Sequence, residues 1–235
     1  MSLGKQLTLP LAHRPAQGLT DFLVSDCNRA AFRAVTSDDG AGLARLAISG
    51  PEGAGKTHLA SIWAQSRGAV RLSLPALDDA TLAQIPVAPA VVLEDADVAL
   101  EHAGPERASQ EVGLFHLLNL TKAEGTPLLL TARTPPARWQ VTTPDLVSRL
   151  SALAHVSVDL PDDDLLTRLL SKLFKDRQLN VGADVLSFLI DRTERSFAAA
   201  EEIVAELDAT ALARRRAITR RLASEVLAAR QDTQR

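Results

Sequence analysis

The chain has 235 residues, of which 46% are hydrophobic and 23% are charged, a composition typical of a globular protein with one large domain or two smaller ones. Its single cysteine excludes a disulfide framework and a cysteine-based zinc site within the monomer. The net charge of −3 lacks the basic excess that gives duplex-DNA binders their affinity for phosphates, so we expect no sequence-specific DNA binding.

Membrane and single-strand binding are also disfavoured by composition. No apolar run approaches the roughly 20 residues needed to cross a bilayer, and the first residues lack the basic and then apolar pattern of an export signal. Aromatic residues make up 3% of the chain, which leaves little for a platform that stacks single-stranded nucleic acid. We expect a cytoplasmic protein without a membrane partner.

The beginning of the chain is predicted to be extended. Its first 17 residues contain two prolines and show no helical periodicity, which indicates an arm. A short helix is predicted over Asn28–Val35, with Ser25 or Asp26 as its cap.

After a glycine-rich turn at residues 38–42, short apolar segments alternate with helical ones. The predicted strands are Leu46–Ser49, Val70–Leu74, Ala90–Glu94, Pro127–Thr131 and His155–Val158. The predicted helices between them are Lys56–Ser66, Gln110–Glu124 and Asp145–Ala152. Repeated alternation with nearly continuous apolar strands predicts an α/β domain over residues 18–160, with a five-stranded parallel sheet covered on both faces.

Beyond residue 160 the strand pattern stops and helical periodicity takes over. The predicted helices are Asp162–Gln178, Ala183–Arg192, Ser196–Arg216 and Thr219–Ala229. We expect three parts, with the arm at 1–17, the α/β domain at 18–160 and a helical domain at 161–235.

The most specific motif is a phosphate-binding loop that follows the first predicted strand and opens a helix. The pattern G-x-x-x-x-G-K-[ST] is matched in full by Gly50-Pro51-Glu52-Gly53-Ala54-Gly55-Lys56-Thr57. Glycines let backbone N–H groups surround phosphates at a helix N-terminus, while Lys56 reaches the β- and γ-oxygens and the Thr57 hydroxyl ligates Mg²⁺. The motif predicts ATP or ADP with Mg²⁺; the alternative is a chance match.

Two carboxylates end a later apolar strand, where a P-loop protein needs them. Glu94 is predicted to stand near Mg²⁺ and Asp95 to orient the attacking water. Glutamate extends its carboxylate one methylene further than aspartate, which argues against fast hydrolysis. The alternative is a strand that ends in a solvated acidic turn with Asp97.

These features together resemble the AAA+ ATPases, a P-loop NTPase fold with a five-stranded parallel sheet core and a C-terminal α-helical lid. The segments Thr131–Pro136 and Pro144–Leu150 resemble the sensor 1 and Box VII segments of the bacterial initiator DnaA, and Asp21–Val24 resembles its adenine-side segment. The resemblance covers about residues 19–230. It implies that Leu23 and Val24 contact the nucleotide base.

Within this group the chain resembles the Hda family of DnaA homologues. The segment at residues 6–11 is similar to the family's sliding-clamp-binding peptide, which assigns clamp contacts to Gln6, Leu7, Leu9, Pro10 and Leu11. DnaA continues into a basic helix-turn-helix domain, whereas this chain ends at Arg235, so we expect no such domain here. The alternative for the hexapeptide is an edge strand of the protein's own fold.

The Hda resemblance implies a regulator rather than a free-standing hydrolase. Its implied partners are the β sliding clamp of DNA polymerase III and DnaA, whose bound ATP it causes to be hydrolysed, at the replisome in the cytoplasm. Homo-oligomerisation is left open. We expect the protein's own ATPase to be weak.

The resemblance also assigns roles to two arginines. Arg149 matches the Box VII arginine, a finger that reaches the γ-phosphate on a DnaA subunit, and such fingers are worth about 10³–10⁵ in rate. The alternative is an ion pair with Asp145 at i, i+4 on one helix. Arg195 looks like the sensor 2 arginine that contacts the bound nucleotide, and the alternative is a surface arginine near a helix start.

One departure from DnaA and one basic run complete the pattern. Ala132, followed by Arg133, stands where DnaA has an acidic sensor 1 residue. The run Arg214–Arg216 with Arg220 and Arg221 is read as a solvated helix end rather than a nucleic-acid contact. A different class of function, an autonomous P-loop ATPase of the motor or helicase-loader kind or a small-molecule kinase, stays open.

Overall fold

The computed structural model describes residues 18–37, 44–101 and 104–233. The predicted clamp-binding residues 6–11 therefore lie outside the described residues, and their assignment stays a prediction.

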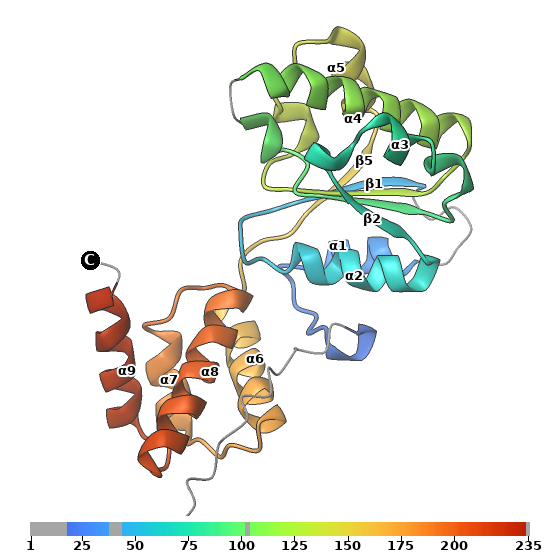
Figure 1. Cartoon of the computed structure of the whole chain (residues 1–235). Helices are drawn as coiled ribbons and strands as arrows, with labels where there is room; N and C mark the ends of the chain where they lie inside the picture. Colours follow the sequence, from blue (N-terminus) through green and yellow to red (C-terminus); the bar gives the residue numbers. More distant parts are fainter. Residues whose placement is uncertain (1–17, 38–43, 102–103, 234–235) are drawn as a thin grey trace, which may run out of the picture.

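A five-stranded sheet forms the centre of the first part of the chain (Figure 1). Its strands are β1 Arg45–Ser49, β2 Val70–Ser73, β3 Val91–Glu94, β4 Leu128–Ala132 and β5 Ala154–Ser157. They run in the order β2-β3-β4-β1-β5, and every neighbouring pair is parallel. All five predicted strands are confirmed.

Burial explains why the central strands are apolar and the edge strands are not. Strand β4 is buried at every residue, and β1 and β3 are buried except at one end, as expected for strands covered on both faces. Every residue of β5 is at least partly exposed, and exposed positions alternate with half-buried ones.

Helices cover both faces of the sheet (Figure 1). Helices α1 Arg29–Thr36 and α2 Lys56–Arg67 pack on one face, and α3 Asp79–Leu82, α4 Pro105–Ala123 and α5 Pro144–Ser151 lie on the other. Helix α4 begins five residues before the predicted start because Pro105 suits the first turn, where its missing N–H has no helical partner. Helix α3 was not predicted, since four residues carry no periodicity.

The predicted cap of the first helix was wrong. Helix α1 begins after Asn28, not after Ser25 or Asp26. The Asn28 side chain accepts a hydrogen bond from the Ser25 N–H at 2.9 Å and donates one to the Leu23 carbonyl at 2.9 Å. Asn28 therefore fixes the start of the helix against the preceding segment. The sequence pattern does not reveal this role.

The second part of the chain is a bundle of four helices with a core of its own. Its helices are α6 Asp163–Asp176, α7 Ala183–Ile190, α8 Phe197–Arg214 and α9 Arg220–Thr233. Leu166, Leu170 and Phe174 on one face of α6 pack in that core. The four predicted helices are confirmed, and no helix in the described ranges is long and apolar enough to cross a membrane.

Candidate nucleotide-binding site

The phosphate loop connects β1 to α2, as its sequence predicts. Gly53 and Gly55 adopt positive φ angles of 75° and 91°, which glycine tolerates and other residues rarely adopt. A Cβ at Gly50 would lie 2.1 Å from the Val158 carbonyl oxygen. The loop therefore needs glycine for two reasons, backbone conformation and close packing against the strand β5 side.

Lys56 lies inside this loop. It is 7% exposed, and its Nζ donates hydrogen bonds to the carbonyls of Gly50 at 2.8 Å and Pro51 at 2.9 Å. Burial lowers the pKa of Lys56, while the negative charges of Asp95 and Asp97 oppose this shift. The ammonium group is thus held by neutral carbonyls at the place where phosphate oxygens would be its natural partners.

A cavity of about 580 Å³ lies between the loop and the helical bundle, within the roughly 300–1,000 Å³ of small-molecule sites. Its charged and polar walls come from both parts of the chain, and they include Lys56, Thr57, Asp95, Arg133, Lys172 and Glu201. Burial raises the pKa of Glu201. The cavity has the size and the cationic loop that a nucleotide requires.

The two predicted carboxylates take different directions. Asp95 lines the cavity beside Lys56 in a backbone conformation with φ 47°, and its N–H donates to the Thr131 hydroxyl at 3.0 Å. Glu94 instead accepts two hydrogen bonds from Arg71 and is not among the residues that line this cavity. The structure brings Asp95 to the phosphate loop but does not bring Glu94 there, and the predicted roles of both stay predictions.

Asp97 is not the solvated residue of the acidic-turn alternative. It is 3% exposed and accepts hydrogen bonds from the backbone N–H groups of Arg133 and Thr134 and from the Thr134 hydroxyl, all at 2.8–2.9 Å. Asp97 therefore fixes the turn after β4. That turn presents Arg133, whose Nη2 lies 3.1 Å from Glu52 of the phosphate loop.

The described residues contain no group of three His, Cys, Asp or Glu side chains that could hold a metal ion. This fits Mg²⁺ at a phosphate loop, since that ion is held through phosphates, waters and only one or two protein groups. The exposed Thr57 hydroxyl and Asp95 line the cavity together, and they are the groups that fit it.

The start of α8 rests directly on the phosphate loop. The Phe197 N–H donates to the Gly53 carbonyl at 3.0 Å, and the Ser196 hydroxyl caps α8 by accepting from the Ala199 N–H at 3.0 Å. A Cβ at Gly53 would lie 2.4 Å from the Ser196 Cβ. The helical bundle and the phosphate loop are thus in direct contact at this point.

Arg195, the predicted sensor 2 residue, precedes this cap rather than opening the helix. Its Nη2 lies 2.9 Å from Asp163 Oδ1 at the start of α6, and its side chain is 56% exposed. It is not among the residues that line the cavity. The structure pairs it with another part of the bundle, so its contact with nucleotide stays a prediction.

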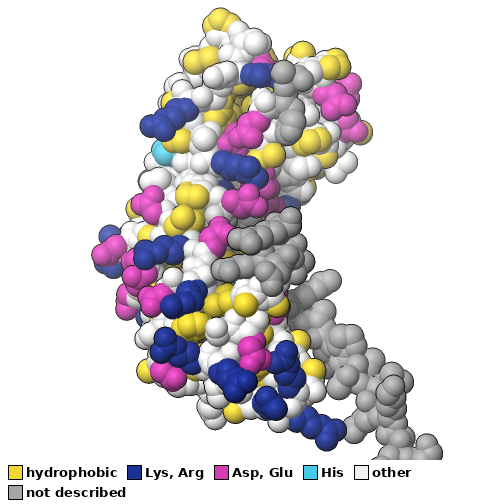
Figure 2. Space-filling model, turned by 90° about the vertical axis from the view of Figure 1, so that its left-hand side faces the viewer, with side chains coloured by type: hydrophobic (Ala, Val, Ile, Leu, Met, Phe, Trp, Pro, Cys, Tyr) yellow, Lys and Arg dark blue, Asp and Glu magenta, His cyan; other side chains and the backbone are white. Residues whose placement is uncertain are grey.

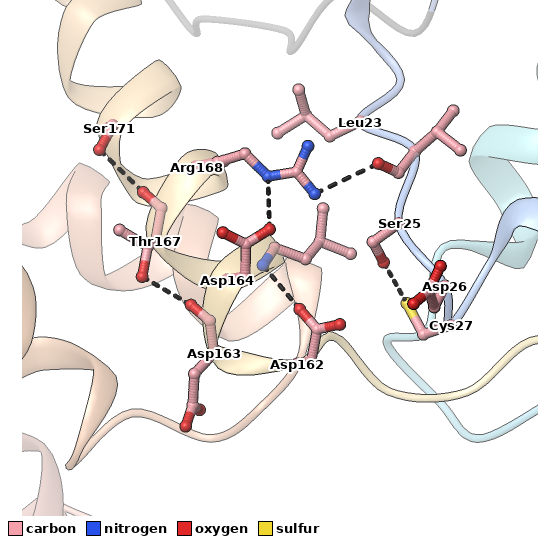
Figure 3. A network of polar contacts seen from close by, with 12 residues as sticks. Leu23, Ser25, Asp26, Cys27, Asp162, Asp163, Asp164, Thr167, Arg168 and Ser171 are labelled. Atoms are coloured by element: carbon pink, nitrogen blue, oxygen red, sulfur yellow. Dashed lines mark hydrogen bonds and ion pairs between the residues drawn. The ribbon is translucent and has the colours of Figure 1, made fainter.

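The predicted base-side segment links the sheet to the bundle (Figure 3). Leu23 lines the cavity and packs against the bundle core, whereas Val24 packs against the core beneath α1 and α2. Arg168 on α6 donates to the Val24 carbonyl at 3.2 Å and pairs with Asp164 at 3.0 Å. Only Leu23 of the two predicted residues therefore reaches the cavity with its side chain.

A second link closes the same side of the cavity. Lys172 on α6 lies 3.1 Å from Asp21 and 2.8 Å from Asp176. Hydrogen bonds to Asp176 and Asp21 raise the pKa of Lys172. The sequence did not predict Lys172, Asp176 or Glu201 as cavity residues. Each is a charged residue of an amphipathic helix, where the sequence pattern indicates only a solvent-exposed face.

Arg149 lies in the last turn of α5, which leads to the start of β5, whereas the phosphate loop follows the end of β1. Strands β1 and β5 are parallel, with Leu46 opposite Ala154. Arg149 therefore lies near the amino ends of these strands, whereas the phosphate loop lies at their carboxyl ends. Its guanidinium lies 5.1 Å from the centre of the Phe115 ring. Within the described ranges it forms no ion pair with Asp145, so the intrahelical alternative is not observed.

The arginines between α8 and α9 take local partners. Arg214 and Arg221 both pair with Glu225, and the Arg220 guanidinium lies 5.1 Å from the centre of the Phe188 ring. On the face drawn in Figure 2, basic side chains over the helical part are interspersed with acidic ones. This arrangement is typical of a solvated helical surface.

No protein-family model matches the sequence, and no curated protein matches it. Solved structures do match. Domain III of the replication initiation protein DnaA from Thermotoga maritima superposes with a TM-score of 0.76 at 15% identity, covering 91% of this chain and 96% of that one. The AMPPCP-bound DnaA from Aquifex aeolicus gives a TM-score of 0.68 at 21% identity, covering 82% and 65%.

The RuvB Holliday junction branch migration motor from Thermotoga maritima also matches, with a TM-score of 0.68 at 14% identity, covering 91% of this chain and 72% of that one. The chain has the AAA+ fold, which confirms the predicted α/β class with its parallel sheet and C-terminal helices. Its fold resembles that of DnaA domain III. The chain spans about two thirds of the length of the first DnaA structures that it matches.

Proposed function

We propose that this chain is an Hda-type regulator of DnaA, a nucleotide-bound protein that accelerates hydrolysis of the ATP held by DnaA while tethered to the sliding clamp. Its finger is Arg149, and its tether is the segment with Gln6, Leu7 and Leu9. Support for the group comes from the fold it shares with DnaA domain III. Support for the role comes from the contacts of single residues.

The observation that carries the proposal is the placement of Arg149. A guanidinium that served the chain's own nucleotide would face the phosphate loop, yet Arg149 stands at the opposite edge of the sheet. Its Nε is enclosed without an acceptor in the described chain, and arginine stays charged at all physiological pH values. A permanent cation that has no acidic partner among the residues the structure describes suits a phosphate that another subunit presents.

Nucleotide binding by the chain itself rests on the phosphate loop and the cavity beside it. Two of the matching DnaA structures hold AMPPCP, an adenine nucleotide. In this chain Lys56 would meet the phosphates and Leu23 would contact the base. Mg²⁺ would be held by Thr57 and the phosphates, where it supplies charge neutralisation.

Weak hydrolysis follows from the contacts of Glu94. Its carboxylate is shared with Arg71 instead of facing the phosphate loop. Asp95 is the one carboxylate of the predicted pair on the cavity wall. A site that holds a nucleotide without quickly cleaving it suits a regulator.

The tether can be weighed against its entropy. An extended backbone places Leu7, Leu9 and Leu11 on one side, and burying three leucines contributes about 5–9 kcal/mol, while ordering six residues costs a similar amount. Each site should therefore be weak. Main-chain pairing and the binding of two arms to one ring would supply the surplus.

The test is hydrolysis of DnaA-bound ATP with clamp loaded on DNA. We expect Arg149→Ala to abolish the acceleration, while Arg138→Ala, an exposed arginine on the same part of the chain, should retain it. Gln6→Ala should abolish clamp capture and leave ADP binding intact. If the Arg149→Ala variant accelerates hydrolysis as wild type does, Arg149 is not the arginine finger.

An autonomous ATPase is the second candidate, and one observation favours it: Lys56 and Asp95 line a single cavity. It predicts steady hydrolysis by the isolated protein above about 1 s⁻¹, the usual enzyme range. If the chain is a regulator instead, its own ATP hydrolysis should be much slower, and DnaA and clamp should not raise that rate.

A further inference from the structure

A second arginine lies beside Arg149 at the far edge of the sheet. Arg45 is the first residue of β1, and the next residue, Leu46, pairs with Ala154 at the start of β5. Helix α5, which carries Arg149 in its last turn, leads directly into that strand. The two arginines therefore belong to neighbouring elements where α5 leads into the sheet, and their charges are close enough to affect each other.

Neither guanidinium has a counter-ion in the described part of the chain. Nε and Nη2 of Arg45 and Nε of Arg149 are enclosed without a hydrogen-bond acceptor. Burial lowers the pKa of Arg45, and the neighbouring charge of Arg149 lowers it further. Enclosed donors without acceptors and paired like charges both cost stability.

The two residues are nevertheless held in place. The Arg149 guanidinium lies against the Phe115 ring of α4, and Arg45 is anchored by a strand whose four other residues are buried. The remaining guanidinium nitrogens of both residues are not among the enclosed atoms. The pair thus offers two positive charges held in place, and an outside ligand would contact the nitrogens that are not enclosed.

We infer that Arg45 and Arg149 together form a receptor for a multiply charged phosphate anion presented by a partner protein. Two guanidinium groups offer more positive charge and more donors to the several oxygens of a terminal phosphate than one does. The identity of the anion, the triphosphate of a nucleotide bound to the partner, rests on the proposed function. Arg45 is then a second phosphate-binding residue of the site that Arg149 completes.

The first test uses inorganic tripolyphosphate as the probe on the full chain, titrated calorimetrically with saturating ADP and Mg²⁺ in cell and syringe so that the chain's own site stays filled. Wild type should bind one equivalent at low salt. Arg45→Met and Arg149→Met should each weaken binding by about tenfold or more, the loss of one charge-assisted hydrogen bond. Arg221→Met, which removes an exposed arginine, should match wild type.

Two results would overturn the inference. One is wild-type affinity for tripolyphosphate in Arg45→Met, or no uptake by wild type. The other concerns thermal melting without the anion: removing an unpaired, enclosed charge should leave the melting temperature unchanged or raise it. A clearly lower melting temperature in Arg45→Met would mean that its guanidinium already has a partner in the chain.

The third arm separates a free polyphosphate from a nucleotide on a partner. With ATP-loaded DnaA and loaded clamp, Arg45→Met should reduce the acceleration by about tenfold and Arg45→Lys should restore part of it. If Arg149→Ala abolishes the acceleration of ATP hydrolysis and Arg45→Met does not reduce it, the proposed function stands and this inference is overturned. No acceleration by wild type, together with tripolyphosphate binding that needs both arginines, overturns the proposed function alone.

Discussion

Arg71 on β2 donates hydrogen bonds from Nε and Nη2 to one carboxylate oxygen of Glu94, at 2.8 and 2.6 Å. Its third nitrogen, Nη1, donates to the Ser61 hydroxyl at 2.8 Å, and that hydroxyl donates to the Thr57 carbonyl at 2.9 Å. Arg71 thereby connects the end of β3 with the helix that begins at the phosphate loop. Arg71 thus pairs with the Glu94 carboxylate, which the sequence predicts to stand near Mg²⁺.

Arg71→Met should release Glu94 and raise the protein's own ATP hydrolysis by roughly tenfold, the scale of one charge-assisted hydrogen bond. Steady-state phosphate release measures this. The pair is partly exposed, so unfolding free energy should fall by only about 1 kcal/mol or less. Arg29→Met, which breaks an exposed pair with Asp26, is the control, and equal hydrolysis in both variants would contradict a restraining role for Arg71.

Lys56→Ala should weaken nucleotide binding by about a hundredfold or more, because two charge-assisted hydrogen bonds to phosphate are lost. Titration with a fluorescent ADP derivative measures the affinity. Lys122→Ala removes an exposed lysine of α4 and should bind as wild type does. Tight ADP binding by Lys56→Ala would show that the cavity is not the phosphate site.

Gly53→Ala tests the contact between the phosphate loop and α8. Gly53 and Gly68 both have positive φ angles, 75° and 63°, but only a Cβ at Gly53 meets Ser196, since nothing lies within 4 Å of one at Gly68. Gly68→Ala should cost about 1 kcal/mol for strain. Gly53→Ala should cost more in urea unfolding and should also weaken nucleotide binding; equal costs would argue that α8 does not rest on the loop.

Glu111 gives a pH-dependent prediction. It is 4% exposed and accepts from the Thr142 N–H at 2.9 Å, the Thr142 hydroxyl at 2.7 Å and Arg107 Nε at 3.3 Å. Burial raises the pKa of Glu111, but these hydrogen bonds outweigh it, so the pKa lies below the ordinary 4.5. The folded state therefore keeps the carboxylate charged at a pH where the unfolded chain takes up a proton.

This stabilisation is fully present above pH 4.5 and is lost as pH falls through the lower folded pKa. Glu111→Gln should lower the unfolding free energy by about 1–3 kcal/mol at pH 7, and the difference from wild type should shrink in acid. Urea unfolding across pH measures it, with the exposed Glu106→Gln as control. A difference that does not change with pH would contradict the hydrogen-bonded carboxylate.

The strands and the phosphate loop could be predicted because their signals are local. A buried parallel strand must be apolar along its whole length, as Val91–Leu93 and Leu128–Leu130 are. Gly53, Gly55 and Lys56 serve a loop whose geometry is set within eight residues. The predicted cap of α1 was wrong because several polar residues stand within three positions of one another. Which of them precedes the helix, Asn28, depends on tertiary packing.

Several charged residues of the site have partners that only the tertiary structure decided. Glu94 meets Arg71 across 23 residues, Asp97 meets the N–H of Arg133 across 36, and Lys172 meets Asp21 across 151. A charged side chain can pair with any opposite charge that the fold brings within reach, and sequence spacing carries no record of that approach. Apolar periodicity is determined along the chain, whereas the pairing or isolation of a charge, including that of Arg45 and Arg149, is determined only when separate elements meet.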